Sequence, residues 1–303
     1  MRISGIRSST LVVAILLTFF AAPASGQWFD TSEVPGGEGD IIQPFTLMGF
    51  NLASGAGLST WIAPGTSEPD ALGLSFLLRG GYRLSSIPIY LGVELPLSFA
   101  SYISPVDGSD ASQFVIGNAG LVFKYRLDPF EETLGIFTGW SLNIYLPTAW
   151  IPDDADDPWG HVVAHGFGLG NSLMGHLHAP ESMAIVATFS VVLPGKIIYG
   201  QVDLSPAVYI PVADTADRET AGAFIWGAAF GVHIIEEIAF LLEFKGFTPL
   251  NIEGSDTAMA ISPGFRMNFG MFEPALWVSI PLNSQYRQGH PDVVIGLDLS
   301  FSF

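Results

Sequence analysis

The sequence predicts an all-β fold in which antiparallel strands, joined in up-and-down order, close into a β-barrel that crosses a membrane. Three observations predict this fold: the composition, an alternation of apolar and polar residues, and connections that alternate between short and long. The 303 residues are 49% hydrophobic and 13% charged, with 34 Gly and no Cys. The charged share is about half that of a typical soluble domain, whereas the apolar share is too high for a disordered chain.

The N-terminus has the layout of a secretory signal peptide. Arg2 and Arg7 precede the apolar run 11–20, and small residues follow as far as Gly26. We therefore assign 1–26 to a signal peptide and 27–44 to a short segment ahead of the barrel. An uncleaved anchor is the alternative, but the apolar run falls short of the roughly 20 residues that a spanning helix needs.

Alternation with a period of two residues, the signature of a β-strand, recurs along the chain. It is clearest in 293–303, where every second residue is apolar: Val293, Ile295, Leu297, Leu299, Phe301 and Phe303. The same pattern predicts twelve strands, at 45–61, 71–83, 87–100, 113–126, 134–147, 183–193, 196–210, 221–233, 237–248, 257–269, 272–282 and 292–303. A bundle of membrane helices is the alternative, but the uncharged stretches carry Gly, Asn, Ser, Thr and Pro at alternating positions, which a lipid-exposed helix would not favour.

Short and long connections alternate between these twelve strands. All the long ones, 62–70, 101–112, 148–182, 211–220, 249–256 and 283–291, fall at one end of the barrel. Bacterial outer-membrane barrels have an even number of strands, short periplasmic turns and longer outer loops. Aromatic residues also gather near the predicted strand ends: Phe45, Tyr82, Tyr125, Phe269, Phe301 and Phe303 at the short-turn end, and Trp61, Phe99, Tyr145, Tyr209, Phe224, Trp226 and Phe244 at the other.

In these features the chain resembles the outer-membrane β-barrel proteins of Gram-negative bacteria, which include porins and channels. The resemblance covers 27–303 as architecture and only the last strand as a motif. It implies a location in the outer membrane and contact with its lipid. It also implies that the terminal strand, with Leu299, Phe301 and Phe303, is the signal read by the barrel assembly machinery.

Two features disagree with twelve regular strands. Pro206 and Pro263 fall inside predicted strands, where the missing N–H breaks the ladder of hydrogen bonds, so we expect bulges or shifted boundaries there. The segment 161–179 offers two further short strands, which would raise the count to fourteen.

Extending the alternation of each strand places ten charged residues on the inward face. They are Arg79, Arg83, Glu94, Lys124, Arg126, Asp203, Glu243, Lys245, Arg266 and Asp298. An Arg or Lys on the lipid side costs about 2–4 kcal/mol at the bilayer midplane, so inward parity is expected. Two interpretations remain open: a salt-bridged interior that holds a narrow barrel rigid, or a field across an aqueous path that orients polar solutes.

The longest connection, 148–182, carries four Asp between 153 and 157, followed by four His. His161 and His165 are weak candidates for a metal site, because they are four residues apart. Glycines spread over 160–175 argue against a stable helix, and a solvated acidic loop is the default expectation. Its apolar residues suggest that the segment packs onto the mouth of the barrel or folds into it.

Several functions are disfavoured. The net charge of −18 makes nucleic acid an improbable partner. No G-x-S-x-G motif, phosphate loop or dinucleotide fingerprint is present, and His233 has no nucleophile motif beside it, so we expect neither enzymatic activity nor a cofactor. The predicted function is a passive channel or transporter for small solutes. A non-conducting structural or adhesive barrel is the alternative, and an outer-membrane hydrolase is the least favoured.

Overall fold

A computed structural model describes residues 55–63, 71–84, 88–104, 107–130, 136–151, 158–170, 175–195, 197–212, 219–251, 257–282 and 293–302. The predicted signal peptide, the segment 27–44, residues 45–54 of the first predicted strand and Phe303 lie outside these ranges. Within them, no helix is long and apolar enough to cross a membrane.

The described residues form thirteen strands and two helices. The strands are β1 (Gly55–Ala63), β2 (Ala71–Arg83), β3 (Ile89–Ile103), β4 (Asp110–Ile116), β5 (Gly120–Phe130), β6 (Ile136–Tyr145), β7 (Ser182–Leu193), β8 (Ile198–Pro211), β9 (Ala221–Ile235), β10 (Ile238–Pro249), β11 (Ala258–Met267), β12 (Phe272–Pro281) and β13 (Val294–Ser302). The helices are α3 (Pro158–Gly170) and α4 (Gly175–His178).

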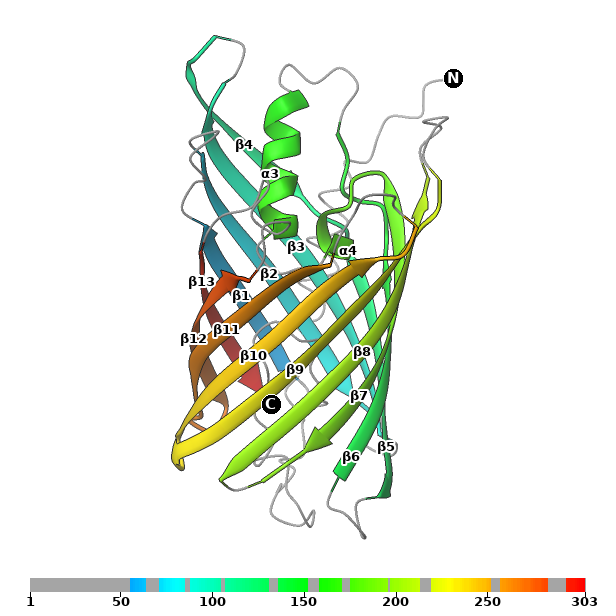
Figure 1. Ribbon diagram of the computed structural model, residues 1–303, viewed down its shortest axis with the longest axis vertical. Helices are drawn as coiled ribbons and strands as arrows, with labels where there is room; N and C mark the ends of the chain where they lie inside the picture. Colours follow the sequence, from blue (N-terminus) through cyan, green and yellow to red (C-terminus); the bar gives the residue numbers. More distant parts are fainter. Residues whose placement is uncertain are drawn as a thin grey trace.

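Twelve of the strands close into an antiparallel barrel. Strands adjacent along the chain pair with each other, except that β3 pairs with both β4 and β5, and β1 pairs with β13 to complete the ring. The strands are tilted, and α3 and α4 lie towards one end, which we call the helix end (Figure 1). The last residues of β13 lie at the opposite end, the turn end, where Ser302 N–H donates to Met271 O across the β11–β12 turn.

The predicted strands agree closely with those observed, with one exception. The expected single strand 113–126 is divided into β4 and β5, which follow each other along the same edge of β3. The interruption at Gly117–Ala119 is where the backbone of the α4 segment approaches, as described below. The alternative of fourteen strands is wrong, because 161–179 contains α3 and α4 instead of two strands.

The alternation of buried and exposed residues shows which side chains point inward. In β8, Gln201, Asp203, Ser205 and Ala207 are buried, whereas Val202, Leu204 and Val208 are each more than 40% exposed. Most of the other strands repeat this pattern and expose large apolar side chains outward, for example Leu91, Phe230 and Leu276. An apolar outer face and a partly polar inner face are the arrangement that a barrel in lipid requires.

The two prolines do not produce the expected bulges. The register between β7 and β8 is the same on both sides of Pro206, and that between β11 and β12 is the same on both sides of Pro263. On one side of each proline, the pair of the proline and the pair of the residue before it are missing from the ladder, β7–β8 for Pro206 and β11–β12 for Pro263. On the other side the ladder continues through the proline, with the pairs Pro206↔Phe224 and Leu242↔Pro263. Near Pro206, the hydroxyl groups of Thr188 and Ser205 form a hydrogen bond of 2.9 Å across the gap.

Several aromatic rings lie on glycines of the neighbouring strand. Tyr145 faces Gly120 and Trp277 faces Gly296 on the inner side, and Trp226 faces Gly246 on the outer side. A Cβ atom at any of these glycines would lie within 2.6 Å of the ring opposite. The absence of a side chain therefore lets the ring lie flat against the wall. Tyr145 and Tyr209 were expected in the aromatic girdle at the end with the long connections. Both have the parity of buried residues and therefore point into the barrel.

Candidate functional site

The structure places all ten predicted charged residues at positions with inward parity. Asp203, Glu243, Arg266 and Asp298 are nearly inaccessible, Arg126 and Lys245 are also buried, and Arg79, Arg83, Glu94 and Lys124 are half-buried. Glu273 on β12 has the same parity as the buried Ala275 and Trp277, so it belongs to this inner set. Sequence reasoning missed it, although extending the alternation of its strand would have found it.

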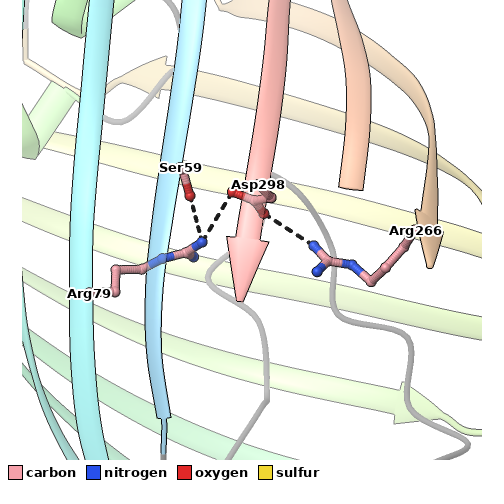
Figure 2. A network of polar contacts seen from close by, with 4 residues as sticks. All are labelled: Ser59, Arg79, Arg266 and Asp298. Carbon is pink, nitrogen blue, oxygen red and sulfur yellow. Dashed lines mark hydrogen bonds and ion pairs between the residues drawn. The ribbon is translucent and has the colours of Figure 1, made fainter. Parts of the chain in front are cut away.

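Asp298 on β13 binds two arginines at once (Figure 2). Its Oδ1 accepts a hydrogen bond of 3.2 Å from Arg79 Nη2 on β2, and its Oδ2 accepts one of 3.1 Å from Arg266 Nη2 on β11. Arg79 Nη2 also donates to Ser59 Oγ on β1, at 2.6 Å. Each arginine reaches across an intervening strand, so this cluster ties together the strands on both sides of the β1–β13 junction.

The cross-strand register explains how the long side chains fit. Ala275 separates Arg266 from Asp298 in one row of paired residues, and Gly227 separates Lys245 from Asp203 in another. Continuing the second row, Ser190 and Gly139 lie between Asp203 and Arg126. Glu94 and Arg79 are direct neighbours. Charges of opposite sign thus alternate around the wall, with small residues leaving space for their side chains.

Polar partners hold several of these charges in place. Tyr145 OH donates a 2.8 Å hydrogen bond to Glu94 Oε2. Gln201 Nε2 donates to Asp203 Oδ1 at 2.9 Å, and Tyr199 OH donates to Gln201 Oε1.

Aromatic rings hold two of the cations. Lys124 Nζ lies 5.4 Å from the centre of the Tyr90 ring, and Arg126 Cζ lies 3.8 Å from that of Phe137. The Phe137 contact is within the range of a cation–π interaction. Together with Glu273, the inner set holds six basic and five acidic residues, so its formal charges nearly balance.

The segment after β6 packs against the inner wall at the helix end. α3 contacts β2, β3 and β4. Its Phe167 ring covers Gly73 of β2, an inward position where a Cβ atom would lie 2.2 Å from the ring. The expectation that glycines prevent a helix here is wrong. Gly168 lets the His178 ring approach to 2.3 Å of where a Cβ would stand, and this packing compensates for the low helix propensity of glycine.

Asn118, between β4 and β5, fixes this segment at both ends. Its Oδ1 accepts a hydrogen bond from Ala149 N–H at 3.0 Å. Its Nδ2 donates to the carbonyl oxygens of His176, Ala179 and Ser182, at 3.1, 2.8 and 3.2 Å. The side chain is fully buried. No sequence pattern pointed to Asn118, because its partners lie about 30 to 60 residues away.

Three histidines of this segment are buried. The His165 and His178 ring centres are 5.8 Å apart, and the His176 ring lies 4.4 Å from that of Tyr145. Burial lowers the pKa of His165 to about 4 and that of His178 to about 3, and it lowers the pKa of His176 well below its ordinary value. All three rings are therefore neutral at pH 7.

The remaining predicted site residues lie apart from this cluster. His161 is half-buried on α3, with Nε2 3.3 Å from Gln113 Nε2 of β4. Among the described residues, no group of three or more His, Asp or Glu is placed to hold a metal ion. His233 lies at the turn end of β9, where its N–H donates to Ile197 O. In the terminal strand, Leu299 and Phe301 lie within β13, and the Phe301 ring stacks on Phe272 at 4.9 Å.

No protein-family model and no curated protein matches this chain. Solved structures do resemble it. An outer membrane channel from Pseudomonas putida F1 matches with a TM-score of 0.56 and 12% identity, over 87% of this chain and 100% of that chain. The NanC porin matches with a TM-score of 0.50 and 7% identity, over 82% and 100%. At such low identities the likeness shows the fold, a barrel of the kind found in outer-membrane channels and porins.

Proposed function

We propose that the protein is an outer-membrane channel through which small solutes diffuse. The observation that carries this proposal is the closed twelve-stranded barrel whose outward side chains are apolar and whose inward side chains include at least eleven charged residues. A barrel built only as a scaffold has no need of so many inward charges, because an apolar core of the same volume is often as stable as a buried ion pair. Its fold resemblance to an outer membrane channel supports the same function.

In this proposal the helix end faces the outside of the cell and the turn end faces the periplasm, as in barrels with short periplasmic turns. Export by the predicted signal peptide and insertion by the barrel assembly machinery precede function, and membrane lipid contacts the outer face. Solutes pass the α3–α4 segment and then the rows of alternating charge. A wall with nearly balanced charges of both signs offers contacts to polar solutes of either sign, so we expect weak ion selectivity.

Planar bilayer recordings of the purified barrel test the proposal. We expect reproducible conductance steps whose size changes by twofold or more when Arg79, Lys124 and Arg266 are replaced together by Gln, since these replacements alter the charges along the path. The comparison variant is Arg83→Gln, which removes a single inward cation at the turn end of β2 and should change the step size less. Folding of every variant is checked by heat-modifiable migration on a gel.

The absence of steps from correctly folded protein, at neutral and at acidic pH, would contradict the proposal and favour the structural or adhesive barrel. Hydrolysis of ester substrates that disappears in His233→Ala would instead favour the enzyme.

A further inference from the structure

We propose that helices α3 and α4 form an acid-released gate at the mouth of the barrel, latched by Asn118 and held shut by the neutral state of His165, His176 and His178. This inference rests on the proposed channel function for its consequence, but the motion itself can be tested without any current. Its basis is the position of three buried imidazoles in two helices that pack on the inner wall without joining its strand ladders.

The two helices are attached to one part of the barrel wall. α3 packs on the inner side of β2, β3 and β4, with Phe167 seated on Gly73. α4 is held by its backbone: Leu177 O accepts from Asn118 N–H at 2.6 Å, and the Asn118 side chain binds the carbonyl groups on either side. Neither helix belongs to the hydrogen-bonded wall, because the twelve-stranded ring closes without them. Release of α3 therefore leaves the ring of strand ladders intact.

The histidines make the attached state sensitive to acid. Neither ring nitrogen of His176 or of His178 has a hydrogen-bond partner, and both rings are fully buried. The charged groups that influence the three rings are basic: Lys245 of β10 acts on His176, His161 of α3 acts on His165, and the imidazoles act on one another. A backbone hydrogen bond with Trp150 raises the pKa of His165, but by less than burial lowers it. The His176 ring contacts the Tyr145 ring of β6, and the Tyr145 hydroxyl donates its hydrogen bond to Glu94 of β3. Glu181, the carboxylate that follows α4, is buried at the start of β7.

The sign follows from the direction of these shifts. Each imidazole is harder to protonate when attached than when released, where its pKa returns to about 6.5. The attached state is therefore fully stable above pH 6.5 and loses stability as the pH falls below that value. At pH 4.5, two units below the released pKa, His165 and His178 should each shift the equilibrium towards release by about a hundredfold, because their attached pKa values of about 4 and 3 keep them largely neutral there. His176 acts in the same direction.

Hydrogen exchange of α3, measured by mass spectrometry on the full-length barrel, tests the inference directly. After correction for the intrinsic effect of pH, we expect exchange of the α3 amides to be at least tenfold faster at pH 4.5 than at pH 7.5, with the strand amides unchanged. In the variant H165Q/H176Q/H178Q this acceleration should disappear. The matched control is H161Q on the same helix, which removes a half-buried imidazole and should retain the acid acceleration. Asn118→Ala should accelerate exchange already at pH 7.5.

A lock provides a second, independent variant in case the triple substitution fails to fold. The chain has no Cys, so Gly73→Cys with Phe167→Cys introduces a single possible disulfide. A Cβ at Gly73 would lie 2.7 Å from Phe167 Cβ, so a shift of about 1 Å gives the usual disulfide spacing. The oxidised lock should abolish the acid response, and reduction should restore it.

Recordings at both pH values separate the two proposals. If α3 is released by acid but no current is seen at any pH, the gate stands and the channel function fails. If the barrel conducts while α3 keeps its protection at pH 4.5, the channel stands and the gate is refuted. Conductance that rises on acidification in the wild type and stays constant in the oxidised lock supports both.

Discussion

At the scale of single residues, Asp298 is the most sensitive point of the inner wall. Its carboxylate is buried and binds both Arg79 and Arg266. Asp298→Ala leaves two guanidinium groups inside the barrel without their anion, and removing one partner of a buried ion pair costs about 3–5 kcal/mol. We expect a loss of this size in the free energy of unfolding, measured by urea titration in detergent with the gel shift as the signal.

A triple replacement separates the cost of a broken pair from the value of an intact one. Arg79→Met, Arg266→Met and Asp298→Leu together remove all three charges at similar volume. Because apolar residues often substitute for a buried ion triad without loss, this variant should unfold closer to the wild type than Asp298→Ala does. If the triple variant is the less stable of the two, the network contributes more than the desolvation of its charges costs.

The inward orientation of the ten charged residues could be predicted from strand parity. Charges are disfavoured on the lipid-facing side of a strand, and successive side chains of a strand point to opposite sides. Asn118 was beyond the reach of the sequence for the opposite reason. It lies between two strands, and its four hydrogen bonds depend on where residues 149, 176, 179 and 182 fold. A single polar residue at the end of an apolar segment carries no periodic signal.

At the scale of elements, the strands were predictable and the helices were not. A strand shows its period of two locally, as in β2, whose bounds Ala71–Arg83 match the expected 71–83. α3 has several glycines and carries no acidic residue in its first turn, so its local signals oppose a helix. It forms because Ala164, His165 and Phe167 become buried on the wall. Helical stability of this kind comes from tertiary packing.

The glycines opposite aromatic rings make a specific prediction about the strands. Gly296→Ala in β13 would place a Cβ 2.0 Å from the Trp277 ring, so the ring must move. Overpacking of this type costs about 1–3 kcal/mol. The matched control is Gly80→Ala in β2, where no atom lies within 4 Å of the added Cβ. We expect urea unfolding to show a loss in the first variant and little change in the second. Equal losses in both would mean that the rings do not depend on these glycines.

At the scale of the whole molecule, closure depends on the last strand meeting the first. Eight residue pairs join β1 to β13, and eight join β12 to β13, so β13 completes the ring only when its full length is in register. The Asp298 cluster lies at this junction and links β2, β13 and β11. The junction of the first and last strands is thus also held by an ion triad of Asp298 with Arg79 and Arg266.

This arrangement makes the terminal residues a test of assembly as distinct from stability. We expect Phe301→Ala combined with Phe303→Ala to reduce the amount of heat-modifiable barrel in the outer membrane several-fold, because these changes remove the proposed recognition signal of the barrel assembly machinery. The matched control is Phe272→Ala, which removes the same ring stack at 4.9 Å but leaves the terminal motif intact. It should lower stability slightly and leave the assembled amount unchanged. Equal yields from the terminal double variant and from Phe272→Ala would show that the ring contact, and not the terminal motif, is what β13 contributes to closure.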